Sequence, residues 1–336
     1  MTTLRLLVGY DAAIAELARE LDACGAGDRI TIRSYLIEPG ESTDRVLAAL
    51  RGALERGASA TVSSDGTLAS WFAHFWERTE THFHAVSALA SEFSPRARAS
   101  RIRFVDHSKY AIFERASGAT AILGGMNLGD RFRPWRDFAA HVSGEPVRAM
   151  LEALGGAGPG TASGTTFVAN VPRSGRFEVR AAFERLAGDP TLAWFRVAMA
   201  YIDRVGARIL ATALARGARV ELLVPGAANV YQHSNMRTVA RLLGAGGELR
   251  VVACNAMVHA KALVAGGANG PTVALLGSAN LKRNSLLRYG ELDALITDPS
   301  FLGELDGAFT GLVSESEVVV RPRYRLLAAL VEERFG

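Results

Sequence analysis

The sequence is organised around His107-Ser108-Lys109, which is followed by Gly124-Gly125-Met126-Asn127. The same pattern returns as His259-Ala260-Lys261, followed by Gly277-Ser278-Ala279-Asn280. The second histidine lies 152 residues after the first, and the second glycine motif lies 153 residues after its counterpart. A spacing this steady indicates duplication of one structural unit. We therefore expect the two copies to build one site from two halves.

The residues around the motifs predict an α/β fold. Residues 29–37 alternate and are rich in β-branched side chains, residues 46–54 have helical spacing, and residues 60–62 begin another strand, an order typical of a parallel βαβ unit. The same order returns in the second half, over residues 192–202, 208–214 and 220–225. The sequence thus predicts two duplicated α/β lobes, each a mixed, mostly parallel sheet flanked by helices. We expect a pseudo-twofold axis to relate them, with one active site at their interface.

A glycine-dense segment with few aliphatic residues begins at Gly155 and predicts the boundary between the lobes. We expect an N-terminal lobe over residues 1–154, a Gly-rich linker over residues 155–166 and a C-terminal lobe over residues 167–336.

The composition is that of a folded globular protein, because 49% of the 336 residues are hydrophobic. A net charge of +4 and a pI near 9.3 favour anionic partners without choosing among phosphate esters, anionic lipid and nucleic acid. The two cysteines, Cys24 and Cys254, have no metal-ligand spacing and indicate neither a disulfide framework nor a zinc site. With no secretory signal and no long apolar run, we expect a cytoplasmic protein, in peripheral contact with a membrane surface at most.

A helical region over residues 68–93 carries aromatic side chains at helical spacing. They are Trp71, Phe72, Phe75, Trp76 and Phe83. Stripes of this kind are usually buried, so we expect core packing, with contact to lipid at an interface as the alternative.

The paired motifs supply the groups that phosphodiester chemistry needs. Alternate side chains of an extended chain share a face, so His107 and Lys109 should project into one cleft, as should His259 and Lys261. One neutral imidazole can attack phosphorus while the other protonates the leaving alcohol. The lysines, with Asn127 and Asn280, supply positive charge and hydrogen-bond donors, so we expect neither a metal nor a cofactor. Residues with little or no side chain, expected to let the backbone approach the substrate, are Gly124, Gly125, Gly277 and Ser278.

Each histidine also needs an acceptor for its second ring nitrogen. Asp137 lies 30 residues after His107 and Glu291 lies 32 residues after His259, each at the start of a strand-like run. Twofold geometry would let each acid serve the histidine of the opposite half. Asp293, on the same face of its strand as Glu291, is the weaker alternative.

These residues resemble the phospholipase D superfamily, whose signature is His-x-Lys-x4-Asp followed by Gly-[Gly/Ser]-x-Asn, present twice. The likeness spans residues 30–320 and is closest to the bacterial cardiolipin synthase branch. The resemblance implies that His107 is the nucleophile and that His259 is the general acid and base. The sequence departs from the signature at Glu114 and Gly266, which stand where the two aspartates are usual. In the family that aspartate braces the hairpin.

The expected function is phosphatidyl transfer or phospholipase D-type hydrolysis of an anionic glycerophospholipid, through a phosphohistidine and without a metal. We expect the partners to be a phospholipid substrate and an alcohol or water as acceptor. One alternative is a nuclease of the same superfamily, which the basic pI permits but which the lack of a lysine-rich run disfavours. Another is a catalytically impaired protein that still binds phosphodiesters, motivated by Glu114 and Gly266.

Overall fold

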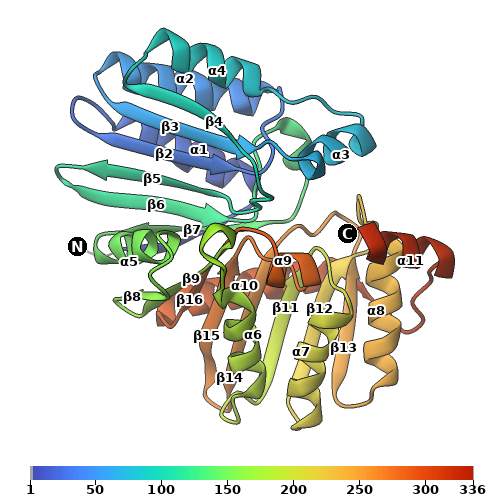
Figure 1. The fold of residues 1–336 in the computed structure, drawn as a ribbon. Helices are drawn as coiled ribbons and strands as arrows, with labels where there is room; N and C mark the ends of the chain where they lie inside the picture. The colour runs from blue at the N-terminus through green and yellow to red at the C-terminus, as the bar shows by residue number, and fades with distance from the viewer. Residues whose placement is uncertain (1–2, 336) are drawn as a thin grey trace.

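The computed structural model describes residues 3–335, apart from the side chains of Phe72, Trp76, Glu77 and Phe335. Two sheets lie one above the other, each with helices on its outer face (Figure 1). This is the predicted two-lobed α/β fold.

The first sheet has the strand order β1-β7-β6-β5-β2-β3-β4. Its strands are β1 (Leu4–Val8), β2 (Arg29–Ser34), β3 (Ser59–Asp65), β4 (Ala97–Ile102), β5 (Tyr110–Arg115), β6 (Gly118–Gly124) and β7 (Phe138–Ser143). The helices that accompany it are α1 (Tyr10–Asp22), α2 (Glu41–Glu55), α3 (Leu68–Glu77), α4 (Phe83–Glu92), the short 3-10 helix η1 (Asp130–Phe132) and α5 (Glu145–Leu154).

The second sheet repeats this order as β9-β16-β15-β14-β11-β12-β13, with β10 and β17 added at its edges and β8 paired to β9. The strands are β8 (Gly160–Ala162), β9 (Thr165–Val171), β10 (Arg176–Phe177), β11 (Trp194–Met199), β12 (Arg219–Pro225), β13 (Leu249–Cys254), β14 (Lys261–Gly267), β15 (Gly270–Gly277), β16 (Glu291–Ile296) and β17 (Ser316–Val318). The helices are η2 (Pro172–Ser174), α6 (Glu178–Gly188), α7 (Arg204–Ala215), α8 (Gln232–Gly244), α9 (Arg283–Leu287), α10 (Pro299–Ser314) and α11 (Leu326–Phe335). The matched strand order is what duplication of one unit predicts.

The expectation of mostly parallel sheets is wrong. In the first sheet only the pairs β2–β3 and β3–β4 are parallel, and the other four pairs are antiparallel. The βαβ unit was recognised in the sequence, but the strands on either side of the glycine motifs join by hairpins, which force antiparallel pairing.

The segment expected to be a Gly-rich linker is partly ordered into the second sheet. Residues 160–162 form β8 and pair with β9, which begins at Thr165. Gly160 has no space for a side chain, because a Cβ there would lie 1.9 Å from the carbonyl oxygen of Ala149 in α5. The glycines of this segment therefore serve close packing against α5 as well as chain reversal. The domain boundary itself stays a prediction.

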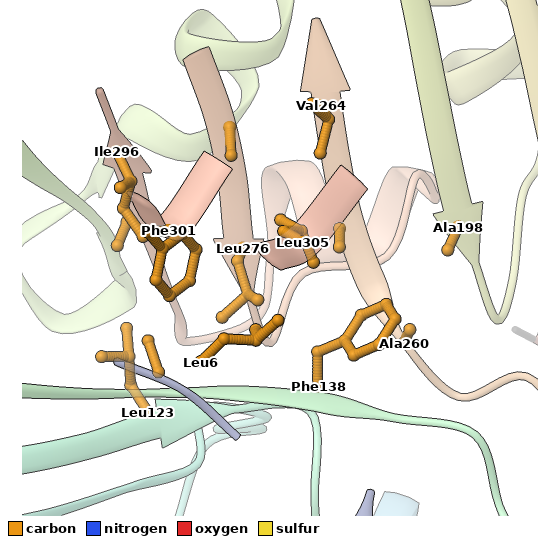
Figure 2. Packing of buried hydrophobic residues seen from close by; sticks show 14 of the residues in the cluster. Leu6, Leu123, Phe138, Ala198, Ala260, Val264, Leu276, Ile296, Phe301 and Leu305 are labelled. Atoms are coloured by element: carbon orange, nitrogen blue, oxygen red, sulfur yellow. The ribbon is translucent and has the colours of Figure 1, made fainter. Parts of the chain in front are cut away.

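The two lobes share one hydrophobic core. The outer face of the first sheet packs on α1, α2 and α4, and its inner face meets the second lobe through Leu6, Leu123 and Phe138. Figure 2 shows these side chains opposite Leu276, Phe301 and Leu305 of the second lobe. Helix α10 lies between the sheets and contacts both β1 and β15. Because burial of apolar area is the main stabilising contribution to folding, this shared core fixes how the two halves of the site meet.

The aromatic stripe of residues 68–93 is only partly buried, so the expectation of core packing is wrong in part. Phe83 is 6% exposed, as expected, but Trp71 is 59% and Phe75 is 64% exposed. The side chains of Phe72 and Trp76 lie outside the described residues.

No helix in the described part of the chain combines the length and the apolar character that crossing a bilayer demands.

Candidate active site

The two histidines lie in extended segments that cross between the lobes. His107 lies between β4, which ends at Ile102, and β5, which begins at Tyr110. The backbone N–H of His107 donates to the carbonyl of Gly290 (2.8 Å), and that of His259 donates to the carbonyl of Arg136 (2.8 Å). Both acceptors immediately precede a predicted acidic residue. Each histidine is thus held by the opposite lobe, which pseudo-twofold symmetry requires.

The acidic residues are crossed in the same way. His259 Nδ1 lies 2.8 Å from Asp137 Oδ2, and His107 Nδ1 lies 3.3 Å from Glu291 Oε2. Asp137, Glu291 and His259 are buried, and His107 is largely buried. The weaker alternative, Asp293, instead accepts hydrogen bonds from the backbone N–H groups of Ser278 and Ala279.

These contacts decide which nitrogen of His107 carries the proton. Nδ1 lies 3.2 Å from the carbonyl oxygen of Ser278, and a carbonyl can only accept a hydrogen bond. Nδ1 therefore carries the hydrogen, and Nε2 keeps the lone pair that a nucleophile needs.

Both imidazoles are held neutral. Burial, reinforced by Lys109 and Lys261, lowers the pKa of His107 well below its usual value. Burial and Lys261 lower the pKa of His259 to about 3. The same burial lowers the pKa of Lys109 to about 7 and that of Lys261 to about 8. Because positive charges crowd here with little solvent, a bound phosphodiester anion would be stabilised and would raise all four pKa values.

The two acids differ in charge. Burial opposes ionisation of Asp137, but Lys261 and the hydrogen bond from His259 outweigh it and lower the pKa of the carboxyl group. Burial instead raises the pKa of Glu291 to about 8, despite Lys109 and the hydroxyl of Ser278. At neutral pH the site thus holds an ionised acid beside His259 and a largely protonated one beside His107.

The asparagines are anchored in equivalent ways. Asn127 Oδ1 accepts from the backbone N–H of Leu36 (3.1 Å), and Asn280 Oδ1 accepts from that of Tyr201 (3.2 Å). With the oxygen engaged by the backbone, Nδ2 of each amide is the group left to donate to a ligand.

The small residues of the motifs pack against the acidic strands. A Cβ on Gly125 would lie 2.6 Å from Asp137 Oδ1, and one on Gly277 would lie 2.1 Å from Asp293 Oδ1. A Cβ on Gly124 would lie 2.6 Å from the carbonyl oxygen of Phe138. These glycines let the strands that carry the acids approach closely, and their contact with substrate stays a prediction. Ser278 donates its hydroxyl to Glu291.

Several aromatic residues at the site were missed in the sequence. The ring centroid of Tyr35 lies 5.0 Å from that of His107, and Trp135 lies 4.8 Å from His259. Tyr201 lies 6.4 Å from His259. Tyr201 corresponds in the repeat to Leu36 and not to Tyr35, because the backbone N–H groups of Leu36 and Tyr201 bond to the matching asparagines, so the duplication carried no signal for this pair.

Lys282, two residues after Asn280, also lies close to the site. Its Nζ lies 3.3 Å from the ring centroid of Tyr231 and 5.6 Å from that of Tyr201. Burial lowers its pKa to about 7, and its charge contributes to the low pKa of His107.

The two departures from the signature lie away from the reacting groups. Glu114 pairs with Arg29 (2.9 Å), and both side chains are partly exposed. Gly266 sits at a β-bulge, where a Cβ would lie 2.0 Å from the carbonyl oxygen of Gly270. An aspartate would not fit at that position, so the second hairpin is closed by backbone packing.

One group in the described part of the chain has metal-ligand geometry. Glu16, Glu20 and His141 are buried together between α1 and β7. Arg19 and Arg115 pair with these carboxylates, and the pKa of Glu20 falls well below its usual value although burial opposes this, because His141, Thr120 and Arg115 bond to it. Charge is already balanced by guanidinium groups, so the cluster fits an ion-pair network better than a metal site.

Comparison with known proteins agrees with this geometry. Residues 194–313 match the family described as cardiolipin synthase, PLD-like domain. The phosphatidylserine synthase of Haemophilus influenzae Rd KW20 is similar in structure, with a TM-score of 0.72 and 12% identity over 99% of this chain and 92% of that one. The polyphosphate kinase of Porphyromonas gingivalis has a TM-score of 0.64 and 14% identity over 99% of this chain and 52% of that one. No curated protein sequence matches.

The fold and the site together define a two-lobed α/β protein with paired His-x-Lys motifs at a pseudo-twofold interface. The family match lies within the C-terminal lobe, and the chain as a whole shares the fold of phosphatidylserine synthase.

Proposed function

We propose that the chain transfers or hydrolyses the phosphatidyl group of an anionic glycerophospholipid through a phosphohistidine at His107. The observation that carries the proposal is the crossed pairing of each histidine with an acid of the opposite lobe. That pairing turns Nε2 of His107 away from the acid, while Nε2 of His259 lies 3.0 Å from the Lys261 ammonium. The site alone would serve any phosphodiester, and the cardiolipin synthase description of the matched family supports a lipid.

The reaction proceeds in two steps. His107 Nε2 attacks phosphorus and forms a P–N bond while the P–O bond to the leaving alcohol breaks. The bound phosphodiester anion raises the pKa of His259, so that its imidazolium form, stabilised by the ionised Asp137, carries a proton on Nε2. The leaving oxygen takes that proton. In the second step an acceptor alcohol or water gives its proton to His259 and attacks phosphorus, which breaks the P–N bond and restores His107.

The lysines and asparagines stabilise the transition state. Negative charge develops on the phosphoryl oxygens during both steps, and Lys109 and Lys261 supply fixed positive charge in a buried site, where it is poorly screened. Asn127 and Asn280 add amide donors. With this charge supplied by the chain, we expect activity to persist in the presence of EDTA.

The test is incubation of the purified protein with phosphatidylglycerol vesicles, followed by identification of the products. Free glycerol with a diphosphatidyl product would support transfer, and phosphatidic acid would support hydrolysis. A ³²P-labelled phosphoenzyme that is stable in base, labile in acid and absent from His107→Ala is expected in either case. If no phospholipid reacts while single-stranded DNA is cleaved, the nuclease alternative replaces the lipid reading. If no phosphodiester labels the wild-type protein, the alternative of an impaired binding protein stands.

A further inference from the structure

Two helices expose apolar side chains, one in each lobe. On α3, Leu68 is 82%, Trp71 is 59% and Phe75 is 64% exposed. On α11 the exposed apolar residues are Leu326, Leu327, Leu330 and Val331. The spacing in each helix puts these side chains along one face. Apolar surface of this extent is usually covered by a partner.

Helix α3 begins at the rim of the first half of the site. Asp65 accepts a hydrogen bond from the backbone N–H of Asp106 (3.0 Å), the residue before His107. The same carboxylate also accepts from the backbone N–H (2.8 Å) and hydroxyl (2.6 Å) of Thr67, which caps α3. Leu68, the first residue of the helix, is thus three residues from a group bonded to the histidine segment.

Helix α11 lies at the rim of the second half. Glu332 accepts from the backbone N–H of Ser234 in the first turn of α8 (2.7 Å), and Glu333 pairs with Arg237 of the same helix (3.1 Å). Helix α8 starts directly after Tyr231, the residue whose ring contacts Lys282. Figure 1 shows α3 and α11 at the same edge of the molecule, one on each lobe.

Exposed arginines flank both stripes. The segment that leads into α11 carries Arg321, Arg323 and Arg325, all exposed, and none of the three has an ion-pair partner among residues 3–335. Arg78, also exposed, follows α3. The carboxylates of α11 point toward α8 instead, as their contacts with Ser234 and Arg237 show.

We propose that α3 and α11 form a surface that docks on an anionic phospholipid bilayer. The apolar stripes would enter the headgroup region, and the arginines would contact lipid phosphates, which is how amphipathic helices with basic flanks bind membranes. Covering the same surface with a second copy of the chain would bring the unpaired arginines of both copies together, whereas anionic lipid neutralises them. The alignment of the site with its lipid substrate rests on the proposed function, but binding to the bilayer does not.

The test is cosedimentation with vesicles of phosphatidylglycerol and of phosphatidylcholine. The variants are Trp71→Ser with Phe75→Ser on α3, and Leu327→Ser with Leu330→Ser on α11. The matched control is Leu151→Ser, an exposed leucine (38%) on α5 at the opposite edge. We expect the wild type and the control to bind phosphatidylglycerol vesicles and each double variant to bind at least tenfold more weakly, with an unchanged thermal midpoint. The wild type should bind phosphatidylcholine vesicles more weakly than phosphatidylglycerol vesicles. High salt should also weaken its binding to phosphatidylglycerol vesicles.

Two further measurements separate this inference from the proposed function. His107→Ala should bind vesicles as the wild type does, and the helix variants should keep wild-type turnover of a short-chain phosphatidylglycerol below its micellar concentration. Vesicle binding without turnover would overturn the proposed function and would still support the membrane-docking surface. Double variants that bind vesicles as tightly as the wild type would overturn the surface. A wild-type dimer that is lost in the double variants, together with no vesicle binding, would also overturn it and assign the surface to a second copy.

Discussion

His259 Nδ1 lies 2.8 Å from Asp137 Oδ2, although 122 residues separate the two in the chain. The contact crosses the interface between the lobes, and the pair His107 and Glu291 crosses it in the opposite direction. Neither half of the chain therefore holds a complete site, and the shared core between the sheets is what keeps each histidine oriented. The chemistry depends on how the lobes pack.

The first prediction separates the roles of the two histidines. His107→Ala should lose turnover by roughly a thousandfold or more and should form no phosphoenzyme, because it removes the Nε2 that attacks phosphorus. His259→Ala should still form the phosphoenzyme with a substrate whose leaving group needs no proton, such as a p-nitrophenyl phosphodiester. The measurements are steady-state turnover and ³²P labelling. Labelling of His107→Ala at the wild-type level would assign the nucleophile elsewhere.

The second prediction uses the unequal charge of the two acids. Asp137 is ionised, so Asp137→Asn removes the charge that stabilises the imidazolium of His259 and should lower kcat roughly a hundredfold or more at pH 7. Burial raises the pKa of Glu291 to about 8, so Glu291→Gln replaces a mostly neutral group by a neutral one and should cost less than about tenfold. The two variants are each other's control. Equal losses at pH 7 would contradict the assigned charges.

Much of this arrangement was accessible from the sequence, for identifiable reasons. The duplication is visible in the repeated motifs of the sequence. Pairing of two equal lobes about a twofold axis then implies that Asp137 and Glu291 each face the histidine of the opposite lobe. The exposure of Trp71 and Phe75 was not accessible, because helical spacing reports a shared face and not what covers it. Lys282 was equally hidden, since its place beside Tyr231 depends on how two distant loops meet.

The third prediction concerns stability and pH. Burial raises the pKa of Asp293 from 3.8 to about 8, so the folded state holds more protons than the unfolded state between these values, and stability falls as pH rises through this window. The Asp293→Asn variant has no carboxyl group at this position, so its stability should not fall with pH for this reason. Its thermal midpoint should match the wild type near pH 3.5 and exceed it increasingly toward pH 8.5.

Asp137→Asn is the opposite control for that experiment. In the folded wild type the pKa of the Asp137 carboxyl group is lowered. The ionised carboxylate therefore stabilises the wild type above pH 3.8, and this stabilisation is lost as pH falls through the pKa of the folded state. The variant should therefore melt below the wild type at neutral pH, with a difference that shrinks on acidification. A parallel response of the two variants to pH would refute the assignment.

The fourth prediction tests Lys282 as an anion contact. Lys282→Met keeps the side-chain length and its packing on Tyr231 but removes the charge. We expect KM to rise about tenfold and kcat to change less than about threefold, since a charge that is equally close to substrate and transition state contributes uniform binding. Arg283→Met, at the exposed neighbouring position, is the control and should leave KM unchanged. An unaltered KM in Lys282→Met would return this lysine to a structural role.

The fifth prediction concerns the two positions where the signature aspartate is missing. Glu114→Ala removes a partly exposed ion pair with Arg29 and should cost less than about 1 kcal/mol of stability, with turnover within about twofold of the wild type. Gly266→Asp, which restores the usual residue, should destabilise the protein by about 3 kcal/mol or more, because its Cβ would lie 2.0 Å from a backbone oxygen at the bulge. Denaturant unfolding and turnover measure both. The second hairpin closes by packing on its own backbone and has no need of the aspartate. A gain of stability or activity in Gly266→Asp would contradict this, because it would show that the hairpin still accommodates the aspartate of the signature.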